Sequence, residues 1–417
     1  MINTQRININ SEIGKLDAVI LHKPGSEVEN MTPESAKRAL YSDILNLDVA
    51  LKEYSQFKGV LDKVAKTYEI KELLFDVIQD KDVRGALLDD ILSQENVWGE
   101  DTFIRNLPDD KLASQLIEGV PIHKDNLTKF LSRERYSLVP LHNFFFTRDA
   151  SMAIQNNILI GAMANNVRNR EALIMKAIFK NHPELKANVN DLAERDNCSS
   201  TCTIEGGDVL VAREDILLIG IGTRTTTQGV DYILRRLKEM GLTRHIIIQE
   251  LPTAPESFIH LDMTFTFLDN NQCMVYEPLI LKPNKYQTVH IYIENGKVKS
   301  IQNENNILDS LKKLGMDLEP VFCGGKKDQM IQEREQWHSG ANFFAIAPGK
   351  VIGYERNVYT IEEMNNHGYE VIRARDVIKG KTHPDGYNKC VITIEGSELA
   401  RGGGGARCMT MPVRRVG

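Results

Sequence analysis

A repeated strand–turn–strand pattern is the feature that most constrains the fold of this 417-residue chain. Each copy has a polar residue, a strand, a turn and a second strand, and several copies continue through an arginine into a helix. The pattern occupies residues 144–161, 205–222, 262–277 and 342–355, with helices expected over residues 171–179 and 230–240. An N-terminal unit makes about five copies, and units that each leave one face unburied must stack or close into a ring. The pattern alone favours such a ring and an ordinary α/β sheet equally.

The N-terminal part contains one α/β unit and then changes character. A strand is predicted over residues 17–21, and apolar residues at helical spacing predict a helix that includes residues 57–64. Beyond this unit helical patterns dominate, including one helix that starts at Pro108 and stops near Gly119. The expected domains are residues 1–75 together with 137–417, and an inserted helical domain over residues 76–136.

The composition excludes several classes of protein. It is 42% hydrophobic and 26% charged, which is typical of a globular protein, and the net charge of −6 provides no basic field for nucleic acid or anionic lipid. No apolar run suits a signal peptide or a membrane span, so we expect a cytoplasmic protein. Six cysteines are too few for a disulfide framework, and all except Cys408 are interpreted as buried or incidental thiols. Cys198 and Cys202 lack the further ligands of a zinc site, and no metal or cofactor is expected.

A run of four glycines leads to a cysteine near the C-terminus. Residues 402–405 are all glycine, and Cys408 follows three positions later. Glycine lets the backbone reach positive φ and approach a ligand closely. A phosphate-binding loop would continue into a helix, whereas Pro412 follows here. The segment is therefore either a loop that presents a thiol nucleophile or a mobile C-terminal turn.

Two polar clusters offer partners for this thiol. In a strand, His260 and Asp262 would share one face, which supplies an acid/base and a carboxylate together. A structural His–Asp pair is the simpler interpretation of those two residues taken alone. Glu205 and Asp208 flank two glycines that suit a close backbone passage, so Glu205 would orient His260 and Asp208 would hold a loop.

A further acid, Asp149, follows an aromatic run at the mouth of a strand, where burial without a cation is costly. Asp149 and Asp262 would suit a planar guanidinium group, which pairs bidentately with carboxylates. Arg168 and Arg224 are then the candidates to bind a substrate carboxylate.

These residues together predict a covalent hydrolysis that needs no metal. Two carboxylates hold a guanidinium, the Cys408 thiolate attacks its central carbon, and protonated His260 donates a proton to the departing nitrogen. Water then hydrolyses the S-alkylthiouronium with His260 as the base. The thiolate is a minority form for an ordinary thiol, so we expect the substrate cation or protonated His260 to favour it.

With these residues, the chain resembles the bacterial arginine deiminases, which are members of the pentein superfamily that modify guanidino groups. The resemblance covers nearly the whole chain and rests on the motifs NFFFTRD at 143–149, EGGDV at 205–209, HLDMTF at 260–265 and GGGGARCMTMP at 402–412. It implies a five-bladed α/β propeller with an inserted helical domain. It also implies hydrolysis of free L-arginine to citrulline and ammonia, the first step of arginine catabolism, in a homo-oligomer that binds neither nucleic acid nor membrane.

The resemblance also implies a role for each matching residue. Cys408 would be the nucleophile and His260 the acid/base, with Glu205 holding His260 and with Asp149 and Asp262 gripping the guanidinium. The residues implied to face the rest of the substrate are Asn143, Phe146, Arg168 and Arg224. The terminal glycine loop would close over the substrate, and it carries arginine only at its flanks, where some members have one inside.

The nearest alternatives share this fold. Agmatine deiminases, dimethylarginine hydrolases, peptidylarginine deiminases and amidinotransferases also use cysteine, histidine and acids. Two candidate carboxylate-binding arginines favour free arginine over agmatine, which has no carboxylate. A non-catalytic binding protein on the same scaffold would not be expected to keep the cysteine, histidine and acids together.

Overall fold

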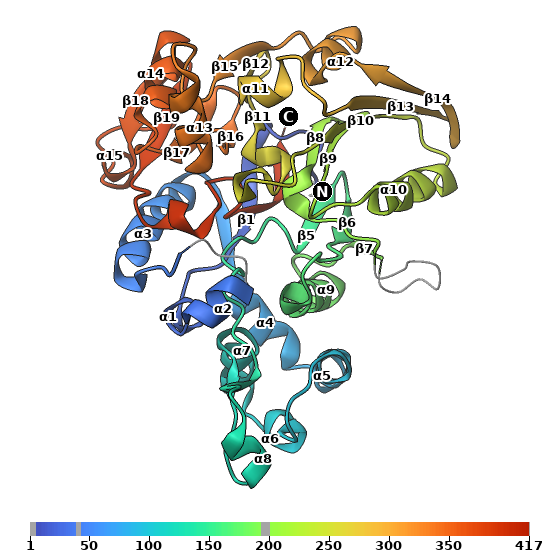
Figure 1. Cartoon of the computed structure of the whole chain (residues 1–417), viewed down its shortest axis with the longest axis vertical. Coiled ribbons are helices and arrows are strands. Elements are labelled where there is room, and N and C mark those ends of the chain that lie inside the picture. Colours follow the sequence, from blue (N-terminus) through green and yellow to red (C-terminus); the bar gives the residue numbers. More distant parts are fainter. Residues whose placement is uncertain (1–5, 39–42, 193–200, 417) are drawn as a thin grey trace, which may run out of the picture.

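A computed structural model describes residues 6–38, 43–192 and 201–416. It is a mixed α/β protein in which small sheets lie around the middle of a broad body, and a group of helices projects from one end (Figure 1). Among the described residues, no helix has the length and apolar composition needed to cross a membrane.

The same strand pairing recurs in five sheets. In each, one strand pairs antiparallel with a hairpin or terminal neighbour and parallel with a strand from further along the chain. The corresponding sets are β1 Lys15–Leu21 with β20 Met411–Val416 and β2 Lys66–Glu69; β6 Asn157–Ile160 with β5 Ser151–Ile154 and β7 Asn188–Asp191; β9 Ile216–Ile221 with β8 Val209–Arg213 and β10 Arg244–Glu250; β12 Gln272–Val275 with β11 Phe265–Asp269 and β15 Glu319–Phe322; and β17 Lys350–Tyr354 with β16 Phe344–Ala347 and β19 Cys390–Ile394. The predicted hairpins are therefore confirmed.

Further strands extend two of these sets, and two more form a separate small sheet. The third set is extended at its β10 edge by β13 Thr288–Glu294 and β14 Lys297–Glu304, and the last by β18 Glu370–Arg373 beside β19. Short strands β3 Val120–Pro121 and β4 Tyr136–Leu138 pair with each other. Because β20 pairs with β1, the C-terminal segment that carries Cys408 is fixed against the first strand of the chain.

Helices pack between and around the sheets. The predicted helices are confirmed as α3 Leu47–Val64, α9 Asn169–Asn181 and α10 Thr227–Glu239. The other helices of the body are α1 Ser26–Glu29, α2 Pro33–Arg38, α11 Glu277–Ile280, α12 Ile307–Lys313, α13 Gln329–Trp337, α14 Val358–Asn366 and α15 Ala374–Ile378. Buried apolar residues between these helices and the sheets form three core clusters, one of which contains Cys408.

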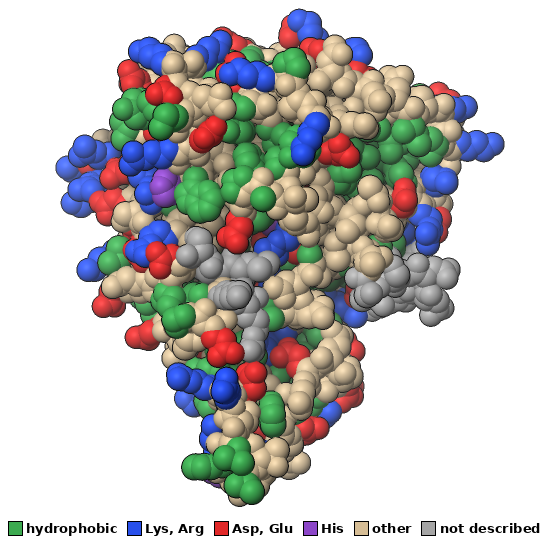
Figure 2. Space-filling model, viewed as in Figure 1, with side chains coloured by type: hydrophobic (Ala, Val, Ile, Leu, Met, Phe, Trp, Pro, Cys, Tyr) green, Lys and Arg blue, Asp and Glu red, His purple; other side chains and the backbone are tan. Residues whose placement is uncertain are grey.

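The helical projection starts before the expected boundary at residue 76, because its first helix begins at Ile70. It contains α4 Ile70–Ile78, α5 Lys81–Gln94, α6 Asp101–Arg105, α7 Asp109–Glu118 and α8 Leu127–Leu131. Pro108 caps the start of α7, and Gly119 ends it at φ +90°, where a Cβ would lie 2.8 Å from the Leu138 carbonyl oxygen. Four large apolar side chains of α6 and α8 are exposed: Phe103, Leu127, Phe130 and Leu131. Figure 2 shows hydrophobic side chains gathered at the foot of the projection.

The cysteines differ from the expectation at one position. Cys273, Cys323, Cys390 and Cys408 are buried free thiols. Cys202 is disulfide-bonded, so its interpretation as a thiol is wrong. The spacing of Cys198 and Cys202 argued only against a zinc site, and it does not exclude a disulfide bond. Cys198 lies outside the described residues.

Candidate active site

The nucleophile candidate sits in a turn immediately before β20. Cys408 is 3% exposed, and its carbonyl oxygen accepts a hydrogen bond from the backbone N–H of Arg148 at 3.1 Å. The side-chain oxygen of Asn342 accepts the N–H groups of Arg407 at 2.9 Å and Cys408 at 3.2 Å. Hydrogen bonds that join the backbone of this turn to Arg148 and Asn342 therefore fix the position of the Cys408 sulfur.

The glycine run is shaped by close approach to its neighbours. A Cβ on Gly404 would lie 2.5 Å from the Phe146 ring, and a Cβ on Gly405 would lie 2.7 Å from the Asn342 side chain. Gly403 has φ +84°, and the Tyr354 hydroxyl donates to the Gly404 carbonyl at 3.0 Å. Glycine is needed here because other chain atoms occupy the space of a side chain.

Replacing Gly405 with alanine should lower kcat by about tenfold or more, since a misplacement of about 1 Å near the chemistry can cost about 100-fold. The new methyl group would displace the Asn342 amide that fixes the turn of Cys408. Steady-state kinetics of the variant measure the effect. Gly386→Ala is the control, because its Cβ meets nothing within 4 Å; equal kcat values in both variants would contradict the argument.

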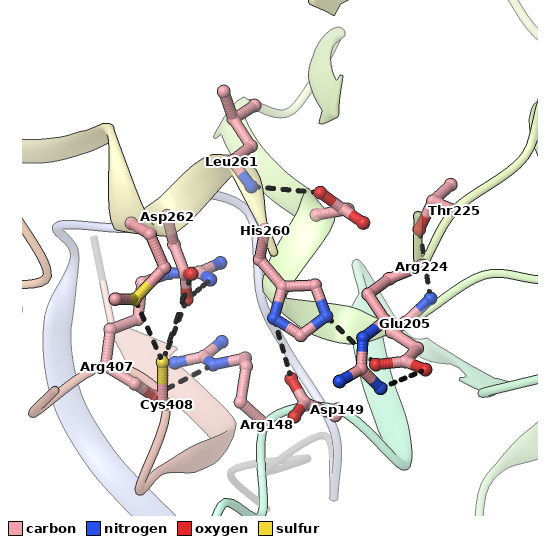
Figure 3. A network of polar contacts seen from close by, with 12 residues as sticks. Arg148, Asp149, Glu205, Arg224, Thr225, His260, Leu261, Asp262, Arg407 and Cys408 are labelled. Carbon is pink, nitrogen blue, oxygen red and sulfur yellow. Dashed lines mark hydrogen bonds and ion pairs between the residues drawn. The ribbon is translucent and has the colours of Figure 1, made fainter. Parts of the chain in front are cut away.

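The imidazole of His260 is held between two carboxylates (Figure 3). Its Nε2 lies 2.9 Å from Glu205 Oε2, and its Nδ1 lies 3.7 Å from Asp149 Oδ1. Burial opposes protonation, but Asp149 and then Glu205 raise the pKa of His260 to about 9. Burial likewise opposes ionisation of Glu205, but the charges of Arg224 and His260 lower its pKa to about 2. The pair is an imidazolium held by a carboxylate at neutral pH.

The glycines between Glu205 and Asp208 make this contact possible. A Cβ on Gly207 would lie 2.5 Å from His260 Nδ1, so only glycine lets the backbone pass the imidazole. Asp208 Oδ1 accepts the N–H of Leu261 at 2.9 Å. This agrees with the expectation that Asp208 holds a loop.

The expected strand through residues 260–264 is wrong. His260 instead precedes a 3-10 turn at Leu261–Met263, and β11 starts at Phe265. Asp208 takes the Leu261 N–H and the Thr264 hydroxyl donates to the Leu261 carbonyl, so side chains satisfy backbone groups that a strand would have paired. The turn still brings His260 and Asp262 to the same site, as Figure 3 shows.

Asp262 is the acid nearest the thiol. Its oxygens lie 3.7 and 3.9 Å from Cys408 Sγ, and its Oδ2 accepts a hydrogen bond from Arg407 at 2.8 Å. Burial, then the charges of Asp262 and Asp149, raise the pKa of the Cys408 thiol well above its usual value. A cation placed against these acids would reverse the electrostatic part of that shift.

The two candidate carboxylate-binding arginines differ in their surroundings. Arg168 donates to Asp149 Oδ2 at 2.8 Å and to Glu171 at 2.8 Å, and lies 3.7 Å from Glu205. Arg224 Nη1 is buried and forms an ion pair with Glu205 Oε1 at 3.5 Å without a hydrogen bond. Arg168 is thus hydrogen-bonded to Asp149, a contact that sequence reasoning missed, whereas Arg224 meets Glu205 through charge.

The remaining predicted residues are in the buried turn that leads to Asp149. The Asn143 carbonyl accepts the Phe146 N–H at 2.9 Å, and the Phe146 ring faces the glycine run. Both side chains are buried. This places Phe146 between the turn and the loop that precedes Cys408.

Oxygen and nitrogen atoms of Asp149, Glu205 and His260 lie within 4.8 Å of one another, which is close enough to share a metal ion. Two guanidinium groups, those of Arg168 and Arg224, already pair with the same carboxylates. The donor set therefore fits an organic cation and a protonated imidazole better than a metal.

The repeated α/β sheets are also found in solved structures of two enzymes that act on guanidino groups. The fold is similar to that of an amidinotransferase from Microseira wollei, with a TM-score of 0.55, 15% identity and 99% and 98% of the two chains covered. It is also similar to a dimethylarginine dimethylaminohydrolase, with a TM-score of 0.51, 14% identity and 95% and 99% coverage.

Sequence comparison identifies the family. The model of the arginine deiminase family matches residues 37–415. Arginine deiminases of Staphylococcus haemolyticus and Streptococcus agalactiae are each 32% identical, covering 98% and 100% of this chain and 98% and 99% of their own. The chain belongs to the arginine deiminase family, which confirms the resemblance drawn from its motifs.

Proposed function

We propose that this protein hydrolyses free L-arginine to L-citrulline and ammonia through a covalent bond between Cys408 and the guanidinium carbon. The observation that carries the proposal is the convergence of one thiol, one imidazolium and two buried carboxylates in a member of this family. Each group has a defined task in the reaction.

Asp149 and Asp262 would hold the guanidinium. Asp149 Oδ1 is buried without a hydrogen-bond partner and lies 3.7 Å from His260 Nδ1, so it is an available acceptor. Asp262 Oδ1 makes one weak contact, with the Cys408 sulfur at 3.9 Å. One acceptor lies beside His260 and the other beside Cys408. Hydrogen bonds to both acceptors would fix the plane of the bound cation.

Binding of this cation would activate the thiol. Without substrate the neighbouring acids and burial keep Cys408 protonated. A guanidinium between the acids cancels their charge and favours the thiolate, which is the reactive form. The nucleophile is thus generated chiefly when its substrate is present.

The reaction then has two stages, formation and hydrolysis of the covalent intermediate. Cys408 Sγ forms a bond to the guanidinium carbon, and the carbon–nitrogen π pair moves onto nitrogen. The His260 imidazolium donates a proton to one terminal nitrogen, the carbon–nitrogen bond breaks and ammonia leaves. A water molecule gives one proton to neutral His260 and attacks the thiouronium carbon. The carbon–sulfur bond then breaks, which releases the thiolate, and the second water proton passes through solvent to the departed ammonia, so that citrulline and ammonium are the products.

The α-carboxylate of arginine would bind at the other end of the site. Asn143, Phe146, Arg168 and Arg224 are the residues we assign to this part. Arg224 Nη1 is ion-paired with Glu205 at 3.5 Å but makes no hydrogen bond, so it is better prepared to donate to a carboxylate than Arg168, whose donors are bound by Asp149 and Glu171. This preference for a carboxylate distinguishes arginine from agmatine.

We further propose that the five sheets are the blades of a closed propeller, with residues 76–136 as an inserted domain. The recurrent pairing and the β1–β20 closure support the propeller. The homo-oligomeric assembly and the cytoplasmic location stay predictions.

A colorimetric citrulline assay tests the proposed function. Purified protein should form citrulline from L-arginine and no carbamoyl product from agmatine, because only arginine offers a carboxylate to Arg224. Absence of citrulline from arginine would reject the proposal, and turnover of agmatine alone would select the agmatine deiminase alternative.

A further inference from the structure

A buried ion cluster connects the N-terminal segment to the reacting groups. Glu12 accepts hydrogen bonds from Arg407 Nε at 2.9 Å and Nη2 at 3.0 Å, and Arg407 Nη1 donates to Asp262 Oδ2 at 2.8 Å. The Arg407 side chain is 1% exposed and that of Asp262 is fully buried. The cluster therefore joins the sequence neighbour of the nucleophile to the acid nearest its sulfur (Figure 3).

The geometry limits how Arg407 can meet Asp262. Nε and Nη2, one edge of the guanidinium, are bound by Glu12, and Nη2 also donates to the Val209 carbonyl at 2.9 Å. Glu12 is itself held by the Val211 N–H at 3.3 Å. Only Nη1 reaches Asp262, and it binds a single oxygen. An arginine without this restraint pairs with a carboxylate through two parallel hydrogen bonds.

We propose that Glu12 is a positioning residue that keeps Arg407 on one oxygen of Asp262 and so leaves the other oxygen for the substrate cation. This inference rests on the proposed function, because it assigns Asp262 to guanidinium binding. Glu12 touches no reacting atom and acts through Arg407.

The charges around the cluster explain why a second carboxylate is needed. The buried guanidinium groups of Arg148 and Arg407 interact with the carboxylates of both Glu12 and Asp262, and the buried guanidinium group of Arg415 interacts with Glu12. Burial and then the Arg407 charge lower the pKa of Arg148 to about 9. Burial opposes ionisation of Glu12, but Arg407 lowers the pKa of Glu12 to about 2.

Without the Glu12 charge, Asp262 would be left to balance the guanidinium groups of Arg407 and Arg148. Its attraction for a third guanidinium group, that of the substrate, would fall. Arg407 would also rotate onto both oxygens of Asp262, since its Nε and Nη2 would lose their partner. Weaker substrate binding is the direct consequence.

The same change would alter the thiol. The charged or titratable groups around Cys408 include Asp262, Asp149, Arg407 and Tyr354, and Arg148 lies beside it (Figure 3). Asp149 and Asp262 disfavour the thiolate and Arg407 favours it. An Arg407 no longer balanced by Glu12 would neutralise Asp262 more fully, so the thiol would titrate at lower pH.

Glu12→Gln is the test, because it removes the charge and keeps the volume. We expect KM for arginine to rise about tenfold or more, with kcat changed by less, because one charge-assisted acceptor for the guanidinium is lost. The pH profile of iodoacetamide alkylation of Cys408, measured without substrate, should move to lower pH. Glu12→Asp keeps the charge, so it should leave the alkylation profile in place and raise KM by a smaller factor.

The control is Glu335→Gln, a buried acid that accepts the N–H groups of Tyr359 and Thr360 in a different network. If the inference holds, Glu335→Gln shares neither effect. It should lower stability without raising KM and without shifting the alkylation profile. Unchanged KM and an unshifted alkylation profile in Glu12→Gln would overturn the inference, as would equal loss of kcat and stability with an unshifted profile. If Glu12→Gln does not fold, an unchanged KM in Glu12→Asp overturns it.

The two proposals fail in different ways. Wild-type protein that forms no citrulline would reject the proposed function, and the alkylation profile would still report whether Glu12 controls the charge at Cys408. Wild-type turnover with unaltered Glu12→Gln behaviour would reject only the positioning role.

Discussion

Replacing Cys408 with alanine is expected to abolish citrulline formation, with a loss of about 10⁴-fold or more, while the protein stays folded. The substitution removes the free thiol whose sulfur lies 3.7 and 3.9 Å from the two Asp262 oxygens. The hydrogen bonds that fix the turn come from backbone N–H groups to Asn342, so alanine retains them. Citrulline assay and thermal unfolding monitored by circular dichroism give the two readouts.

Cys390→Ala is the matched control. Cys390 is also buried and free, but it lies in β19, where the charged groups that act on it are Lys350 and Asp385 and not the site residues. It should cost stability and leave turnover near the wild-type value. Activity retained by Cys408→Ala would mean that another residue is the nucleophile.

Replacing His260 with asparagine should lower kcat by about 10²- to 10⁴-fold, the usual contribution of a positioned acid–base group. The same imidazole protonates the leaving nitrogen and later activates water, so both steps lose their proton carrier. The raised pKa of His260, about 9, also sets a pH limit. The imidazolium is present below that pH and is lost above it, so the wild-type rate should fall as pH rises through about 9.

The pH dependence of kcat checks this assignment. The His260→Asn variant should lose the alkaline limb together with most of the rate. His383→Asn is the control, since the exposed His383 caps a short turn that asparagine also caps. An unchanged alkaline limb in His260→Asn, or a rate within threefold of wild type, would show that another group transfers the proton.

The sequence predicted those site residues that stand in a distinctive short segment. The glycine run, the EGGD segment and the acid after the aromatic run each stood out by residue type alone, and Cys408, Glu205 and Asp149 converge with His260 in the structure. Helices with strong periodicity, such as α3, were also found because spacing alone determines which face is apolar.

The parts that were missed depend on contacts distant in sequence. Glu12 and Arg407 are separated by 395 positions, and no local pattern marks a lone glutamate near the N-terminus as a partner for an arginine beside the nucleophile. The pairing of Arg168 with Asp149 likewise arises only when the helix start and the turn meet. The strand expected at residues 260–264 failed because Asp208 takes the Leu261 N–H from another segment.

The central claim is that Cys408 bonds to the guanidinium carbon of arginine. The most direct measurement is acid quench of the protein during turnover of arginine, followed by proteolysis and mass spectrometry. The account predicts that the peptide containing Cys408 gains the mass of arginine less ammonia, and that Cys408→Ala gains nothing. Citrulline formation with no adduct on that peptide, or with the adduct on a different residue, would contradict it.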